Sequence, residues 1–297
     1  MAKARALDKR RRSIRNIRKI TRTMELIATA QFRRAMDRAL SAAAYTRRIT
    51  ELVGHLAAAG CEVSHPLLEP RTETRRAAVL VLTANRGMCG GYNGGVLRQA
   101  MPQYRSLVET LGSENVELSI VGKRGIGAFR FRKIQPSRTF TQFEDKPAFG
   151  EVDEIAQQYL RAYQSGEIDR LDICYTRFEG MSKQYAVTET LLPLGMPATD
   201  ETADQGVTHH AEYEFLPSAE SILSEVVPMS FRIRLFKCFL DAAVSEQIAR
   251  MIAMKAATEN ADQMIGMLSI MYNRARQSAI TGELLEIIGG ADAISDS

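Results

Sequence analysis

Proline and glycine are scarce at both ends of this chain. None of its nine prolines lies before Pro66 or after Pro228, and glycine is rare in the same two stretches. Because proline breaks helix interiors and glycine weakens them, this distribution predicts one long helix at each end and confines the turns to the middle. At 1.5 Å per residue, helices over 5–58 and 230–288 would be about 80 Å and about 90 Å long. Helices of that length extend beyond any compact core.

The sequence also lacks the features of a membrane-spanning, disulfide-rich or zinc-binding protein. It has no run of about 20 apolar residues, and no apolar signal-peptide core follows Met1, so we expect a soluble protein. His209 and His210 form the only histidine pair, in an acidic loop that makes a poor metal site. No two cysteines form a CxxC pair, which predicts reduced cytosolic thiols at Cys61, Cys89, Cys174 and Cys238.

Positive charge is concentrated at the N-terminus. Residues 1–48 carry 15 Lys or Arg and three acidic residues, a net charge of +12, whereas the remainder holds 24 basic and 32 acidic residues, a net charge of −8. This asymmetry predicts an acidic partner for the arm: nucleic acid, anionic lipid or an acidic protein surface. An Arg-rich N-terminus also resembles a mitochondrial presequence, but a heptad pattern that has already begun by Ile14 argues against a removable leader.

Both terminal segments carry apolar or small residues at alternating steps of three and four, the pattern of a coiled-coil seam. The N-terminal row is Ile14, Ile17, Thr21, Met24, Ala28, Gln31, Ala35, Arg38, Ala42, Tyr45, Ile49, Leu52, Leu56 and Ala59. The C-terminal row is Met251, Met254, Thr258, Ala261, Ile265, Leu268, Tyr272, Ala275, Ala279 and Gly282. We expect the two helices to cover each other in an antiparallel coiled coil. Methionines on the second helix fit either seam filling or a surface that adapts to several partners.

The middle of the chain alternates between strand-like and helix-like segments, which predicts a three-layer, Rossmann-like α/β domain with a largely parallel sheet. The expected strands are 77–83, 116–122, 171–178 and 185–194, and the expected helices are 93–111, 123–132 and 150–165. The predicted divisions are an N-terminal coiled-coil helix at 1–60, the α/β domain at 75–195, a loop at 196–217 and a kinked C-terminal helix at 218–297. In the last of these, Pro228 should interrupt a short helix, with Ser230 capping the long one.

The strongest local motif for an enzyme is the glycine-rich turn "LTANRGMCGGYNGG" at 82–95. A strand that turns through glycines into a helix can hold a phosphate, but the motif matches neither the P-loop nor GxGxxG. Tight strand-to-helix packing is the better explanation, and a nucleotide-binding enzyme remains a minor alternative. The sequence shows no Ser–His–Asp set, and Glu144 and Asp145 are adjacent loop acids. We therefore predict no catalytic residue, metal or cofactor.

A coiled-coil nucleic-acid-binding protein is the second alternative. The cations of the N-terminal arm could contact phosphates, which would make binding fall steeply with ionic strength. Against this, the cations point around the helix and no aromatic side chains are interleaved for base stacking. We therefore expect no nucleic-acid partner.

Three segments resemble the gamma subunits of F-type ATP synthases. They are "RRRSIRNIRKITRTMELIATAQFRRA" (10–35), "RGMCGGYN" (86–93) and "SEQIARMIAMKAATENADQMIGMLSIMYNRARQSAITGELLEIIGGADAI" (245–294). The resemblance implies a non-catalytic rotor shaft inside a ring of three alpha and three beta subunits, with the α/β domain forming a foot with the epsilon subunit on the c-ring. It further implies a peripheral location on the cytoplasmic face of the bacterial inner membrane, reached only through the complex.

The resemblance also assigns roles to individual residues. Arg22 and Met24 match positions that pass an acidic loop of a beta subunit, while Ile287 and Ile288 match the apolar sleeve at the top of the ring. Polar positions expected to contact beta-subunit loops are Arg250, Arg276, Gln277, Thr281 and Glu283. The foot loop contains Arg86, Gly87, Cys89, Gly90 and Gly91. Gly282 departs from the family by replacing a glutamine.

Overall fold

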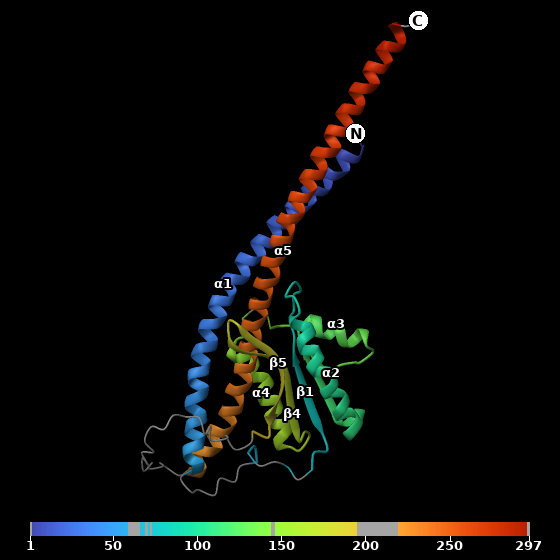
Figure 1. Cartoon of the computed structure of the whole chain (residues 1–297). Helices are drawn as coiled ribbons and strands as arrows, with labels where there is room; N and C mark the ends of the chain where they lie inside the picture. Colours follow the sequence, from blue (N-terminus) through green and yellow to red (C-terminus); the bar gives the residue numbers. More distant parts are fainter. Residues whose placement is uncertain are drawn as a thin grey trace. The chain divides into compact units, whose positions relative to one another are not determined.

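The computed structural model describes residues 2–58, 66–68, 71, 73–143, 146–194 and 219–295. The loop expected at 196–217, the histidine pair, and Glu144 with Asp145 lie outside these residues. Its elements are α1 (Ala2–Ala58), β1 (Ala77–Leu82), α2 (Tyr92–Leu111), η1 (Ser113–Asn115), β2 (Val116–Val121), α3 (Lys123–Phe131), β3 (Arg138–Phe140), α4 (Phe149–Gln164), β4 (Arg170–Gly180), β5 (Lys183–Leu192) and α5 (Ala219–Ser295) (Figure 1). No described helix is long and apolar enough to cross a membrane.

The five strands form one sheet in the order β3-β2-β1-β4-β5. Strands β3, β2, β1 and β4 are parallel to one another, and β5 pairs antiparallel with β4 at one edge of the sheet. This confirms the largely parallel sheet and its four predicted strands. The sequence reading missed β3, because its three residues are exposed or half-buried and form no apolar run.

Helices cover both faces of this sheet, as the three-layer prediction required. Successive side chains of a strand point to opposite faces, so Val79 packs in one apolar core and Leu80 in the other. The first core includes Val96 of α2 and Phe129 of α3, whereas the second includes Tyr159 of α4 and the 227–242 part of α5. Figure 1 shows α2 and α3 on one side of the strands and α4 on the other.

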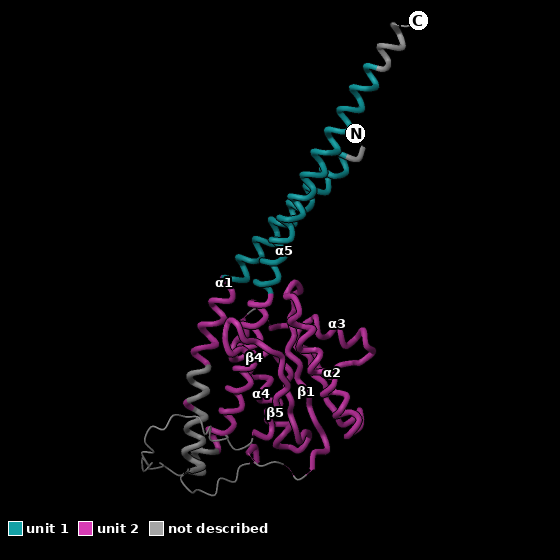
Figure 2. The backbone as a smooth tube through the Cα atoms, in the orientation of Figure 1, with its two compact units in different colours: residues 1–29, 250–297 teal, residues 30–249 magenta. Residues whose placement is uncertain are grey.

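The chain divides into two compact units, and the division cuts both long helices (Figure 2). One unit contains residues 1–29 and 250–297, and the other contains residues 30–249. The lower part of α5 belongs to the α/β unit because Val227, Phe231 and Leu235 are fully buried in its core.

The break expected at Pro228 is wrong. Helix α5 continues through Pro228 from Ala219 to Ser295, so no new helix begins at Ser230. Proline inside a helix removes one backbone hydrogen bond and costs about 3 kcal/mol. Val227 and Phe231, on either side of the proline, are both fully buried. Burying two large apolar side chains offsets that cost, since each contributes about 1.5–3 kcal/mol.

The seam of α5 follows the predicted row: each of its ten members is buried or half-buried. The seam of α1 departs from its predicted row. Ile17 is wrong as a seam position, because it is 46% exposed, and the side chains of the row from Tyr45 onward lie outside those described. Farther along, the seam shifts by one residue at two places. Phe32 and Ala39 are 6% and 5% exposed and take the places expected for Gln31 and Arg38. Gln31 and Arg38 were the two strongly polar members of the predicted row. In each case the next residue in the sequence is apolar, and that residue is the one buried in the seam.

Ion pairs attach α5 to the rest of the α/β unit. Arg232 forms a two-pronged pair with Asp153 of α4, in which Nη2 lies 2.5 Å from Oδ2. Arg234 donates to Glu189 of β5 over 3.4 Å, and the same carboxylate accepts from Arg177 over 2.6 Å. Burial alone would raise the pKa of Glu189, but the neighbouring cations and the Tyr175 hydroxyl hold it below its ordinary value. These contacts join α5 to α4 and to the sheet through charged as well as apolar side chains.

Replacing Asp153 by asparagine is expected to destabilise the unit at neutral pH but not in acid. The hydrogen bonds from Arg232 hold the pKa of Asp153 below its ordinary value near 4. A lowered folded-state pKa contributes stability above the unfolded pKa and loses it as pH falls through the folded pKa. Urea unfolding should show a gap between wild type and variant of roughly 1 kcal/mol at pH 7. The gap should close below about pH 4.

Glu154→Gln is the matched control, because Glu154 is the next residue and is exposed. It should leave the unfolding curve unchanged at every pH. A gap for Asp153→Asn that persists unchanged at pH 3 would contradict the role given to this pair.

Candidate functional site

The unit formed by residues 1–29 and 250–297 is a pair of antiparallel helices. Arg18 Nε lies 2.5 Å from Asp262 Oδ1, and the guanidinium of Arg11 lies 4.7 Å above the ring of Tyr272. Farther along α1, Thr258 Oγ1 donates to Thr21 Oγ1 over 2.9 Å. As the residue number increases along α1, the number of its partner on α5 decreases, so the two helices are antiparallel, as the two heptad rows predicted.

Small side chains occupy the seam of this pair. Ala28 and Ala261 are 1% and 4% exposed, and the hydroxyls of the buried Thr21 and Thr258 satisfy each other. Small residues allow two helix axes to approach closely. A thin helix pair is left with little apolar core of its own.

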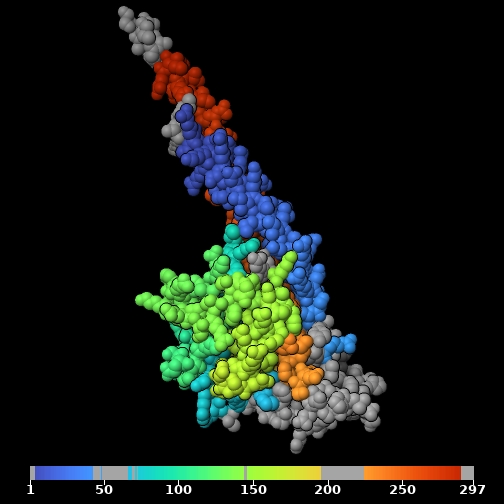
Figure 3. Space-filling model, turned by 180° about the vertical axis from the view of Figure 1, so that it is seen from behind, coloured from blue at the N-terminus to red at the C-terminus, as the bar shows by residue number. Residues whose placement is uncertain are grey.

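Large apolar side chains lie on the outside of this unit. They are Ile17, Ile20, Leu26, Ile27, Ile252, Met267, Ile270, Met271, Ile280, Leu284, Leu285, Ile287 and Ile288, each 45–71% exposed. Figure 3 shows the blue and red surface of the two helices that carry them. Isolated exposed apolar residues are ordinary, but an extended surface of this kind marks a protein interface.

Cations accompany this apolar surface on α1. Few acidic side chains balance them locally: Asp8 lies 2.7 Å from Arg11 and 2.8 Å from Arg12, and Glu25 lies 2.9 Å from Arg22. The hydrogen bond from Arg11 holds the pKa of Asp8 below its ordinary value. The surface is therefore apolar and positive together, which suits an acidic partner that also covers apolar side chains.

The residues assigned by resemblance fall into distinct environments. Met24 is half-buried at the seam, and Arg22 remains 59% exposed although it pairs with Glu25. Arg250 is only 4% exposed and thus lies inside the structure of the chain. The exposed members are Arg276, Gln277, Thr281, Glu283, Ile287 and Ile288. All six lie on the last four turns of α5 for which side chains are described.

Gly282→Ala should stiffen this end of α5. A Cβ at Gly282 would meet nothing within 4 Å, so the change adds helix propensity of about 1 kcal/mol without a clash. Hydrogen exchange measured by mass spectrometry should slow by roughly fivefold in peptides covering 275–288. Gly266→Ala, equally open, should protect only its own stretch of helix. Unchanged exchange at 275–288 would show that Gly282 does not weaken the tip.

The glycine-rich loop between β1 and α2 is packed against its own domain. Met88 and Gly90 adopt φ angles of 62° and 55°, which turn the chain sharply. Cys89 is buried, and its Sγ accepts from Asn93 Nδ2 at 3.1 Å. A Cβ on Gly87 would lie 2.6 Å from Arg124 Nη2, so glycine permits the close approach of that side chain. Gly87 and Gly90 thus have structural reasons to be glycine, whereas a Cβ on Gly91 would meet nothing within 4 Å.

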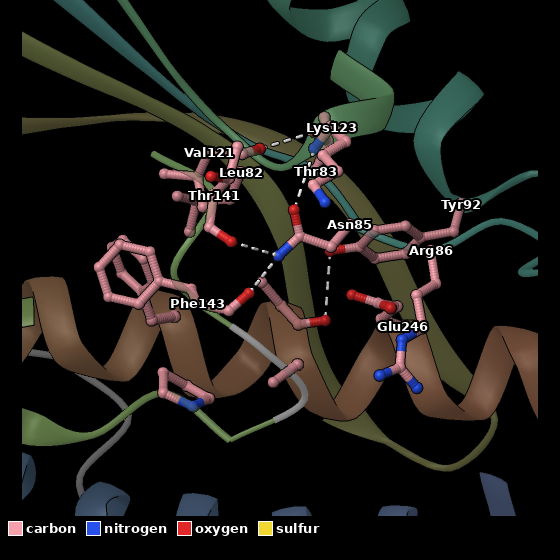
Figure 4. Close-up of a pocket in the computed structure, with 14 residues that line it drawn as sticks. Leu82, Thr83, Asn85, Arg86, Tyr92, Val121, Lys123, Thr141, Phe143 and Glu246 are labelled. Carbon is pink, nitrogen blue, oxygen red and sulfur yellow. Dashed lines mark hydrogen bonds between the residues drawn. The ribbon is translucent and has the colours of Figure 1, made fainter. Parts of the chain in front are cut away.

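A pocket of about 210 Å³ lies at the carboxyl ends of β1 and β2, beside this loop (Figure 4). Asn85 stands at its centre: Nδ2 donates to Thr141 O at 3.1 Å, and Oδ1 accepts from the Lys123 backbone at 3.1 Å. Tyr92 donates to the carbonyl of Ala242 on α5 at 3.2 Å. These groups hold strands and helices together. The sequence did not single out Asn85, because one asparagine after a strand carries no distinctive signal.

Two observations on the described residues concern metal binding and reactive thiols. No group of three His, Cys, Asp or Glu side chains in them could hold a metal ion. Burial raises the pKa of the Cys174 and Cys238 thiols to about 12, so neither is a nucleophile at neutral pH.

Sequence comparisons connect the chain to one family. A family model described as ATP synthase matches residues 3–294. The ATP synthase gamma chain of Rhodopirellula baltica is 60% identical over 296 residues, covering 99% of both chains. The ATP synthase gamma chain of Leptospira biflexa is 36% identical over 297 residues, covering 99% of this chain and 100% of that one.

Solved structures share the fold. A chain from the Euglena gracilis mitochondrial ATP synthase (OSCP/F1/c-ring) matches with a TM-score of 0.63 and 18% identity, covering 99% of this chain and 95% of that one. A chain from the central stalk and c-ring of the Tetrahymena thermophila mitochondrial ATP synthase matches with a TM-score of 0.54 and 19% identity, covering 80% and 99%. This chain therefore shares its fold with chains of solved ATP synthase structures.

Proposed function

Because the chain belongs to the ATP synthase gamma-chain family, we propose that it is the central rotor shaft of an F-type ATP synthase. In this role the helix pair stands inside a ring of three alpha and three beta subunits, and the α/β unit forms a foot on the c-ring with the epsilon subunit. The shaft transmits torque between proton transport and ATP synthesis. Membrane attachment, at the cytoplasmic face of the bacterial inner membrane, is made only through the complex.

The exposed apolar surface of the helix pair is the observation that carries this proposal. Ile270 is 71% exposed and Ile287 is 68% exposed, on a unit too thin to bury them itself. Enclosure by a surrounding ring would cover such side chains on every side of the shaft. Ile287 and Ile288 would then lie in an apolar sleeve at the top, and Arg276, Gln277, Thr281 and Glu283 would face beta-subunit loops.

The chemistry supports a non-catalytic role within the complex. The described residues hold no group of three His, Cys, Asp or Glu side chains for a metal, and burial raises the pKa of the Cys174 and Cys238 thiols to about 12. Torque requires stiffness and asymmetry instead. A shaft that contacts three otherwise equal sites differently gives each a different affinity for its ligand, which couples rotation to binding.

Direct observation of rotation tests this proposal. The ring of the purified complex is fixed to a surface, and a gold rod is attached through a biotinylated cysteine at Ser106, an exposed residue of α2 in the foot. ATP should then drive one-way rotation of the rod in three steps per turn. A rod that stays still while the complex hydrolyses ATP, or a complex lacking alpha and beta subunits, would refute the proposal.

Met24→Lys is expected to loosen coupling between hydrolysis and pumping. Met24 is half-buried beside Arg22 and Glu25, so a lysine there adds charge where the shaft would pass an acidic beta-subunit loop. Proton pumping per ATP hydrolysed should fall in membrane vesicles, while hydrolysis continues. Thr23→Lys adds the same charge on an exposed, neighbouring face and should pump as wild type does. Equal pumping ratios in all three proteins would remove Met24 from the coupling contact.

A further inference from the structure

Helix α3 presents a basic and aromatic surface on the outside of the α/β unit. Its inner face is buried, with Phe129 fully covered by the sheet core. Two residues on, Phe131 points the opposite way, since two helical steps turn about 200°. It is 87% exposed, the highest value among the exposed large apolar side chains. Among the described residues, none covers this ring.

Cations surround this phenylalanine without matching acids. The stretch 118–143 contains six Lys or Arg and no Asp or Glu, although residues 49–297 as a whole are acidic. Arg130, Arg132 and Lys133 directly flank Phe131, and all are exposed. Among described residues, no carboxylate pairs with any of these three, whereas Arg138 farther along pairs with Glu117 at 3.0 Å. Arg132 donates only to the Ala128 carbonyl of its own helix, at 3.0 Å.

We propose that Arg130, Phe131, Arg132 and Lys133, here called the α3 patch, dock an acidic protein surface that has an apolar pocket for Phe131. Aromatic and arginine side chains are the residues most enriched at the energetic centres of protein interfaces. The acid-free cluster specifies the charge of the partner, because opposite charges steer association and like charges oppose it. The α3 patch lies across the sheet from α4 and α5, so the contacts that hold α5 leave it accessible.

Other occupants fit the α3 patch less well. Nucleic-acid platforms stack successive bases on several aromatic rings, and this patch has one. Stable membrane binding needs a wide apolar helix face or a second anchor, whereas a single phenylalanine buries at most about 250 Å². A protein pocket needs only one inserted ring with cations at its rim. In Figure 3 the green segment that includes α3 lies at the outer edge of the molecule.

Photo-cross-linking in the intact complex tests this proposal. Phe131 is replaced by p-benzoylphenylalanine, and the complex is purified from membranes through a tag on this chain, illuminated and digested. We expect one cross-linked peptide from another subunit, with several Asp or Glu residues beside the attachment point. The same probe at Arg105, an exposed residue of α2, should not give that product. Because exposed substitutions seldom change stability by more than about 0.5 kcal/mol, the variant should fold normally.

Charge reversal separates docking from chance proximity. In the protein that carries the probe at Phe131, adding Arg130→Glu, Arg132→Glu and Lys133→Glu should lower the cross-link yield at least about tenfold. Without these three changes, raising the salt concentration from 50 to 500 mM should also lower the yield. The control pair Arg98→Glu and Arg105→Glu reverses exposed charge on α2 and should leave the cross-link yield unchanged. Cross-links to phospholipid or nucleic acid, no cross-link, or a yield indifferent to the reversed charges would overturn the proposal. Rod rotation is measured separately, so failure here would not be confused with failure of the rotor proposal.

Discussion

Gly122→Ala is expected to prevent the α/β unit from folding stably. Gly122 follows β2 with a φ of 94°, and a Cβ there would lie 2.1 Å from the carbonyl oxygen of Thr83. That oxygen belongs to a segment held in place, since Thr83 donates through its backbone to Val121 O at 2.9 Å and through Oγ1 to the same oxygen at 2.7 Å. Backbone strain and overpacking together should cost at least about 3 kcal/mol.

Hydrogen exchange in β1 and β2 measures this effect, because these strands cross the centre of the sheet. Their amides should lose at least about a hundredfold of protection in the Gly122→Ala protein. Gly127→Ala is the matched control in α3: its Cβ would meet nothing within 4 Å, and alanine should add about 1 kcal/mol of helix stability. Equal protection in the two variants would show that the turn after β2 tolerates a side chain.

Asp172→Ala should cause the second large loss of stability. Asp172 is completely buried on β4, and its carboxylate accepts from Gln103 of α2 at 2.7 Å, from Arg170 at 2.9 Å and from Thr190 of β5 at 2.7 Å. These three side chains together satisfy the buried carboxylate. Removing the carboxylate leaves the Gln103 amide and the Arg170 guanidinium without their acceptor. Breaking a buried pair in this way costs about 3–5 kcal/mol.

Urea unfolding at neutral pH, followed by exchange of β4 and β5 amides, would measure the loss. Thr190→Val removes one neutral donor from the same carboxylate and also the acceptor that Thr190 Oγ1 gives Arg170 Nη2 at 3.2 Å, and should cost only about 2 kcal/mol. Asp172→Asn keeps an acceptor of similar size and should fall between the two. A loss for Asp172→Ala no larger than that for Thr190→Val would mean that the carboxylate contributes little to the unit.

Local patterns in the sequence predicted most of the fold. The strand expected at 116–122 is observed at Val116–Val121, and the helix expected at 93–111 is observed at Tyr92–Leu111. These segments are long, strongly patterned and bounded by glycine or polar residues, so their conformation follows from local preference and side-chain periodicity. Strand β3 was missed because three exposed residues form a strand only through pairing with β2.

Long-range packing decided the details that local patterns could not. Proline at position 228 weakens a helix in isolation, yet the sheet core covers Val227 and Phe231 and keeps α5 continuous. Phe32, not the predicted Gln31, occupies the seam of α1, because Phe32 packs in one apolar cluster with Leu240 and Val244. Both outcomes depend on which residues of another element lie opposite, and a single helix pattern carries no such information.

The sequence by itself determined that this protein has two long terminal helices, a largely parallel α/β domain and a family resemblance at both ends. Proline, glycine and apolar spacing act locally, and they act in the same way wherever the chain lies. Only the tertiary structure decided where the compact units divide, that Arg250 is buried, and that Phe131 stands outside among cations that lack acidic partners in the described chain. Those properties depend on burial, and burial is settled by the surfaces that meet when distant segments pack.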